Sequence, residues 1–100
     1  MSFATTTQDD ATVIRVPSRF DFRVAQDFNK TVDTATHGAG SEIIIDLAET
    51  AYLDSSALGM LLVLRDRARA AGKSVVLARA GGTVKGVLGI ANFQRLFVFR

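Results

Sequence analysis

The chain has 100 residues, of which 48% are hydrophobic and 22% charged, and it contains no cysteine. This length supports one hydrophobic core and is short for two, so we expect a single domain spanning residues 1–100. The composition is that of a globular protein, and the lack of cysteine excludes disulfides and thiolate metal sites. No apolar run is long enough to cross a bilayer and the N-terminus lacks an export signal, so we expect a cytoplasmic protein without membrane insertion.

Charge is distributed unevenly along the chain. Residues 1–64 hold four Lys or Arg and nine Asp or Glu, whereas residues 65–100 hold eight and one. A basic half is one signature of nucleic-acid binding. However, the basic residues between positions 65 and 85 have no aromatic residues among them that could act as stacking platforms. Arg65, Arg67 and Arg69 follow one another at steps of about 200° on a helix, so neighbours point to nearly opposite sides. We therefore expect no nucleic-acid partner.

The first half of the chain predicts a hairpin, a helix and a buried strand. Residues 3–7 and 11–17 are β-type runs joined by a polar turn at residues 8–10. Residues 24–36 carry apolar positions at helical spacing, and His37-Gly38 ends that helix. The β-branched run of residues 43–47 is typical of a strand covered on both faces.

The second half continues the alternation of helices and strands. A helical pattern runs from Ser55 to about Ala71, followed by a buried strand over residues 74–79. A short helix over residues 83–91 and a last strand over residues 96–99 complete the chain. The order ββαβαβαβ indicates an α/β protein with a mixed, mostly parallel β-sheet flanked by α-helices.

Several motifs that suggest catalysis or cofactor binding fail on spacing or context. Gly72-Lys73-Ser74 resembles the end of a phosphate-binding loop, but Arg67 stands where its first glycine is required. The glycines at 81, 82 and 86 lack dinucleotide-loop spacing. His37 is the only histidine, and no base and acid accompany a nucleophilic serine. We expect no cofactor, no metal and no enzymatic activity.

The segment from Asp54 to Gly59 carries the strongest functional signal. It follows a buried strand and a short loop, and Asp54 can cap the helix that begins next. Ser55 and Ser56 then lie in the first turn, where free backbone N–H groups and the helix dipole favour a phosphate. Phosphorylation there adds roughly −1.5 to −2 charge without melting the helix. The alternative is that both serines are only capping residues.

The turns after the serines contain more apolar residues than one helix face can bury. Seven of the eight residues from 57 to 64 are apolar. Leu61 and Leu64 belong to a stripe that can face the sheet, whereas Leu58 and Leu62 cannot share it. We therefore expect an exposed apolar patch beside the serines, which is typical of a protein-binding site. Gly59 either lets a partner's backbone approach or packs tightly on a neighbouring helix.

These features resemble the STAS family, which includes the anti-sigma-factor antagonists. The resemblance covers nearly the whole chain and rests on Arg19-Phe20-Asp21-Phe22, Ile43-Ile44-Ile45-Asp46-Leu47, Tyr52-Leu53-Asp54-Ser55-Ser56-Ala57-Leu58-Gly59, Val84, Leu88 and Ile90-Ala91-Asn92-Phe93 before Leu96-Phe97-Val98. The sequence is most similar to the proteobacterial branch, in which partner switching controls biofilm formation, motility or secretion.

The resemblance implies a switch controlled by reversible phosphorylation. In this family a serine-protein kinase that is also an anti-sigma factor phosphorylates the second serine of the motif, which here is Ser56. A PP2C-type phosphatase removes the phosphate, and the unphosphorylated form binds the kinase and frees its other client. The implied partner-binding residues are Asp21, Asp54, Ser55, Ser56, Ala57, Leu58, Gly59 and Leu62.

Three positions depart from the family pattern, and alternatives remain open. Ala57 and Ser18 stand where glycine is common, and the sequence ends at Arg100 where many relatives continue into a further helix. An uncovered element there favours a homodimer or a partner contact. One alternative function is a constitutive cytoplasmic STAS subunit of a lipid-transport ABC system. A small-ligand or nucleotide binder is another, although the phosphate-binding loop is absent.

Overall fold

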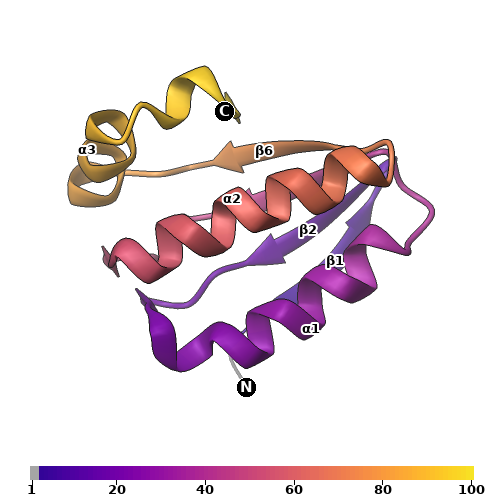
Figure 1. The fold of residues 1–100 in the computed structure, drawn as a ribbon, viewed down its shortest axis with the longest axis horizontal. Coiled ribbons are helices and arrows are strands. Elements are labelled where there is room, and N and C mark those ends of the chain that lie inside the picture. Colours follow the sequence, from indigo (N-terminus) through magenta and orange to yellow (C-terminus); the bar gives the residue numbers. More distant parts are fainter. Residues whose placement is uncertain (1–2) are drawn as a thin grey trace.

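The computed structural model describes residues 3–100, which form a sheet with helices packed against it (Figure 1). The strand order in the main sheet is β1-β2-β4-β6-β7, with β1 antiparallel to β2 and the other neighbours parallel. The strands are β1 (Ala4–Gln8), β2 (Ala11–Arg15), β4 (Glu42–Asp46), β6 (Ser74–Ala78) and β7 (Val98–Phe99). The predicted α/β architecture with a mostly parallel sheet is confirmed.

The turn between β1 and β2 is fastened to the start of β4. Asp9 adopts a φ of 54°, and the carbonyl of Asp10 accepts the N–H of Ser41 at 2.9 Å. A Cβ on Gly40 would lie 2.6 Å from that same carbonyl oxygen, so only glycine fits this approach. The hairpin and the central strand are therefore held in register at one end of the sheet.

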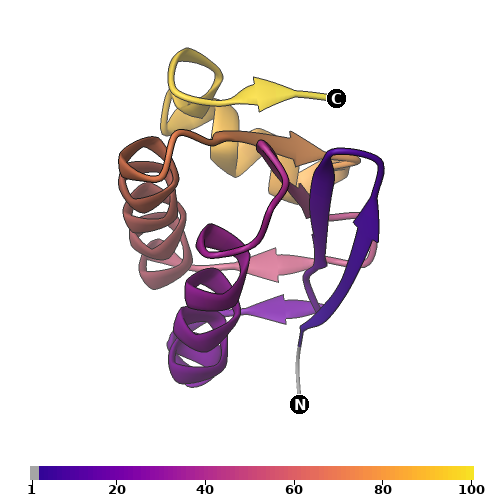
Figure 2. The same cartoon turned by 90° about the vertical axis from the view of Figure 1, so that its right-hand side faces the viewer.

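The helices α1 (Ala25–Thr36) and α2 (Ser55–Ala70) lie side by side on one face of the sheet and run in the same direction (Figures 1 and 2). Their buried stripes pack over Ile43 and Ile45, which are fully buried in β4. The residues of these stripes are Phe28, Val32 and Ala35 in α1 and Ala57, Leu61, Leu64 and Ala68 in α2. Helix α3 (Gly82–Ile90) adds Val84 and Leu88 to the same core. The helical spacings seen in the sequence are confirmed.

Two short strands were not predicted. β3 (Arg19–Phe20) pairs in parallel with β5 (Tyr52–Leu53) to form a separate two-stranded sheet. Between β3 and α1 the chain forms the 3₁₀ helix η1 (Phe22–Val24). A two-residue strand has no period to detect, so the sequence pattern could not reveal this pairing.

The last strand is shorter than predicted. Residues 96–99 were expected to be extended, but β7 contains only Val98 and Phe99. The N–H groups of Leu96 and Phe97 both bond the carbonyl of Phe93, so the turn of η2 (Phe93–Arg95) extends into this segment. Local hydrogen bonding thus replaces the first half of the expected strand.

Candidate functional site

Helix α2 begins at the residue that the sequence predicts. Asp54 has extended backbone geometry, and its Oδ1 accepts the N–H of Ala57 at 2.9 Å. Ser55 and Ser56 follow in the first turn, and both side chains are exposed. The predicted capping role of Asp54 is confirmed, so neither serine is needed as the cap. Both hydroxyls are free to serve another purpose.

The leucines of α2 divide between core and surface. Leu61 and Leu64 are fully buried, whereas Leu62 is 38% exposed and Val63 52%. Leu58 is half-buried and packs against the core. The prediction that Leu58 and Leu62 are more exposed than the other two is confirmed, with Leu62 the freer side chain.

Gly59 faces open space on α2. A Cβ built on this residue meets no atom within 4 Å. The alternative that Gly59 packs tightly on a neighbouring helix is therefore wrong. Its small size instead keeps the surface between the serines and Leu62 flat.

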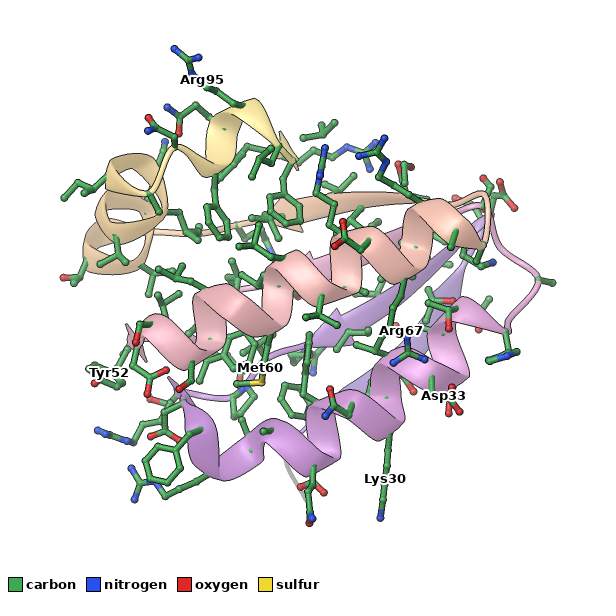
Figure 3. All side chains as sticks on the ribbon, in the orientation of Figure 1. Lys30, Asp33, Tyr52, Met60, Arg67 and Arg95 are labelled. Atoms are coloured by element: carbon green, nitrogen blue, oxygen red, sulfur yellow. The ribbon has the colours of Figure 1, made fainter. Side chains whose placement is uncertain are left out.

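The two serines lie on different flanks of α2. Ser56, Met60 and Arg67 are spaced by four and seven residues, which places them on one flank of a helix with about 100° per residue. Figure 3 shows Met60 between α2 and α1, and Arg67 contacts Asp33 of α1 at 2.9 Å. Ser56 therefore faces the side of α1 and η1, and Ser55 faces away from it.

The β3–β5 pairing carries the segment around Asp21 to the start of α2. Arg19 is opposite Tyr52, and Phe20 is opposite Leu53. The backbone N–H of Asp54 reaches the carbonyl of Phe20 at 3.4 Å. Segments more than thirty residues apart in sequence thus meet directly beside the serine-bearing turn.

Asp21 is buried beside the serine-bearing turn, and its carboxylate contacts the exposed guanidinium groups of Arg19 and Arg23. Its carboxylate is 5% exposed and accepts the backbone N–H of Arg23 at 3.0 Å and its Nη2 at 2.8 Å. The Nε of Arg19 is 3.6 Å away. The hydrogen bond from Arg23 keeps the pKa of Asp21 below its usual value, although burial opposes this. Asp21 is therefore a charged anchor under an exposed pair of cations.

Two exposed aromatic rings accompany these cations. Tyr52 is 44% exposed, with the guanidinium of Arg19 at 4.6 Å from its ring centroid. Phe22 is 67% exposed, and the guanidinium of Arg23 is 6.0 Å from its ring centroid. Exposed Tyr, Phe and Arg side chains are common in protein interfaces.

We call the exposed residues gathered here the switch surface. It consists of Arg19, Phe22, Arg23, Tyr52, Ser55, Ser56, Gly59 and Leu62. Four of the eight predicted partner-binding residues lie on this surface, namely Ser55, Ser56, Gly59 and Leu62. Asp21 and Ala57 are buried and can support it only by positioning their neighbours.

Sequence reasoning missed Arg19, Phe22, Arg23 and Tyr52 as site residues. Arg19, Phe22 and Tyr52 stand in two of the segments that carry the STAS resemblance. Their proximity was the missing information, and only the β3–β5 pairing provides it.

A second cationic region lies at the other end of α2. Arg65, Arg69, Lys73 and Arg95 line one groove between α2 and the η2–β7 segment. Arg65 and Arg69 are one helical turn apart and share this flank. Arg67 between them pairs with Asp33 of α1, so neighbours in this series point to opposite sides, as expected. The Nε of Arg65 donates to the carbonyl of Leu96 at 2.9 Å, so part of this charge supports the chain's own backbone.

Other titratable groups have structural partners. Asp46 is 5% exposed and is paired with Arg79, whose hydrogen bond lowers the pKa of Asp46. His37 is exposed, with its Nδ1 2.7 Å from the carbonyl oxygen of Asp33.

Among residues 3–100, no three His, Cys, Asp or Glu side chains are grouped to hold a metal ion. Within the same range, none of the helices combines the length and apolar character that a membrane span needs.

The fold and the serine-bearing helix start define a STAS domain. A family profile described as "Mlab, STAS domain" matches residues 3–98, so the chain belongs to the STAS family. A STAS-domain containing protein of Pseudomonas aeruginosa (strain UCBPP-PA14) is 40% identical over 84 residues, which are 84% of this chain and 82% of that protein.

Solved structures share the fold at lower identity. An anti-sigma-factor antagonist (STAS) domain protein from Planctomyces limnophilus has a TM-score of 0.87 at 19% identity, over 99% of this chain and 89% of that one. The Bacillus cell fate determinant SpoIIAA in its phosphorylated form has a TM-score of 0.75 at 20% identity, over 99% and 91%. The same fold therefore occurs in a phosphorylated relative.

Proposed function

We propose that this chain is a partner-switching regulator of the anti-sigma-factor-antagonist type. In its unphosphorylated form the switch surface binds a serine-protein kinase that is also an anti-sigma factor. The observation that carries the proposal is Ser56, an exposed hydroxyl on the first turn of a helix already capped by Asp54, about two turns before exposed Leu62 and Val63. Such a surface combines an apolar contact patch with a modifiable group at its edge.

Phosphorylation supplies the switch. The kinase transfers the γ-phosphoryl group of ATP to Oγ of Ser56, so an O–P bond forms, ADP leaves and the hydroxyl proton passes to a base on the kinase. The new dianion lies at a helix N-terminus, where the dipole favours it, so the fold persists while the surface charge changes. A PP2C-type phosphatase reverses the step by delivering water to phosphorus. This chain is the substrate in both reactions and performs no catalysis itself.

The comparisons support this class of function. Relatives with the same fold include anti-sigma factor antagonists, and one of them was solved in a phosphorylated form. The additional support from this chain is the position of Ser56 on the same flank of α2 as Met60 and Arg67, which lie toward α1.

The test is phosphorylation by serine kinases encoded near the gene. Wild type, S56A and S55A are incubated with each kinase and ATP, and the modified residue is mapped by mass spectrometry. We expect stoichiometric phosphate on Ser56 in wild type and S55A and none in S56A. Phosphate only on Ser55, or no phosphorylation by any of these kinases, would count against the proposal.

A second candidate is a constitutive cytoplasmic STAS subunit of a lipid-transport ABC system. The description of the matching family profile favours it. Such a subunit is expected to co-purify in fixed stoichiometry with its transporter whatever the state of Ser56. Affinity purification of tagged wild type and S56D from membranes separates the two functions, because only the partner switch predicts that S56D loses its partner.

A further inference from the structure

The first turn of α2 and the 3₁₀ helix η1 are neighbours. α1 and α2 run in the same direction, and their distal halves are joined by the ion pair between Arg67 and Asp33 at 2.9 Å. Ser56 lies 11 residues before Arg67, and Arg23 lies 10 residues before Asp33. These matched offsets place Ser56 and Arg23 at about the same level along the two neighbouring helices. Ser56 shares the flank of Arg67, which faces α1.

The electrostatics of Arg23 agree with this placement. The hydrogen bond to Asp21 is the main cause that raises the pKa of the guanidinium, and the charges of Tyr52 and Asp54 contribute in the same direction. Arg23 is therefore close enough to interact with the residue that caps α2, two positions before Ser56.

We propose that a phosphate on Ser56 is bound within the same chain by the guanidinium of Arg23, with Arg19 as the second cation and buried Asp21 as the residue that positions both. This inference rests on the proposed function, since it concerns the same serine. The ligand is a phosphomonoester dianion, and the recognition is by charge-assisted hydrogen bonds from planar guanidinium groups.

The donors needed for this contact are available. Arg23 points its Nε and Nη2 at the carboxylate of Asp21, which leaves Nη1 outside that pair. The side chains of Arg23 and Arg19 are 61% and 59% exposed, whereas that of Asp21 is 5% exposed. A phosphate can thus accept hydrogen bonds from the outer edge of Arg23 without displacing Asp21.

Neither neighbouring carboxylate is hydrogen-bonded to Nη1 of Arg23. Asp21 lies underneath the guanidinium groups, and Asp54 accepts the N–H of Ala57. Tyr52 contributes a ring stacked with Arg19. The consequence is that phosphorylation engages cations that the unmodified switch surface offers to a partner, so one modification adds a dianion and occupies two arginines.

The test measures the phosphate directly and needs no kinase. Phosphoserine is incorporated at position 56 by genetic code expansion, and its second pKa, about 6 in free phosphoserine, is followed by ³¹P NMR titration. Wild type is compared with R23Q and R19Q. R95Q is the matched control, because Arg95 projects from η2 at a distance from the start of α2 (Figure 3). Phosphoserine at position 55 is the second control.

We expect R23Q to raise the phosphate pKa by about half a pH unit, since a neighbouring cation favours the dianion. R19Q should raise it less, R95Q should leave it unchanged, and phosphoserine 55 should not respond to R23Q. Thermal unfolding of each variant checks that the fold is retained. An identical phosphate pKa in folded wild type and folded R23Q would overturn the inference.

The two proposals fail separately. If no kinase modifies Ser56 but the NMR shift is present, the proposed function is wrong and the phosphate site stands. If Ser56 is phosphorylated and R23Q leaves the titration unchanged, the regulator stands and the intramolecular contact is wrong.

Discussion

Oδ1 of Asp54 accepts the backbone N–H of Ala57 at 2.9 Å, and this hydrogen bond satisfies a free donor of α2's first turn. It leaves the hydroxyls of Ser55 and Ser56 exposed at the start of the helix.

Removing this cap should destabilise the fold moderately. We expect D54A to lower the free energy of unfolding by about 1 kcal/mol, while D54N retains most of the stability because its amide oxygen accepts the same bond. Urea denaturation of both variants measures the difference. S55A is the control, and equal stabilities of D54A and wild type would show that the cap contributes nothing.

The charge on Ser56 should act on binding and not on folding. We expect S56D to lose affinity for the kinase partner while its melting temperature stays within a few degrees of wild type, because a negative charge suits a helix N-terminus. S56A should bind constitutively. Calorimetric titration and thermal scans measure the two properties, and an unfolded S56D would contradict a surface switch.

Leu61 and Leu62 are adjacent in sequence, but we expect truncation of Leu61 to reduce stability and truncation of Leu62 to reduce partner binding. Leu61 is fully buried, so L61A is expected to cost about 2–5 kcal/mol of stability. Leu62 is 38% exposed, so L62A should change stability by about 0.5 kcal/mol and weaken partner binding. L58A should weaken binding too, with some loss of stability because Leu58 touches the core. Full partner affinity of folded L62A would remove this patch from the interface.

We expect the free energy of unfolding to decrease in acid, because protonation of Asp46 weakens its pairing with Arg79. Its pKa is below the ordinary value of 3.8 in the folded state, chiefly because Arg79 hydrogen-bonds the carboxylate. The unfolded chain therefore takes up this proton first as the pH falls, and the contribution is present above pH 3.8 and lost as the pH drops through the folded pKa. Urea titrations from neutral pH to pH 3 should show less acid dependence in D46N. An unchanged acid dependence would assign the effect to other groups.

The groove of Arg65, Arg69, Lys73 and Arg95 should not make this protein a nucleic-acid binder. Attraction to DNA at low salt is expected to be non-specific and to disappear at physiological salt, because few phosphate contacts are available. Fluorescence anisotropy with duplex and single-stranded DNA measures this. Saturable micromolar binding at physiological salt would give the basic half a function beyond partner switching.

Local patterns in the sequence were sufficient for the main elements and the start of α2. The β-branched run at Ile43 and Ile45 and the apolar spacing around Leu61 depend only on neighbouring residues, and both are buried as expected. The cap at Asp54 is equally local, so the position of Ser56 on a helix start followed from sequence alone.

Tertiary structure alone decided what surrounds Ser56. The pairing of Phe20 with Leu53 joins segments with no shared periodicity, and it brings Arg23 toward the helix that carries the serine. Folding also buried Asp21 and gathered Arg95 with Arg69 at one groove. Hydrophobic period and capping preference extend over a turn or two of chain, whereas these neighbours are set by how parallel strands and their crossover helices pack.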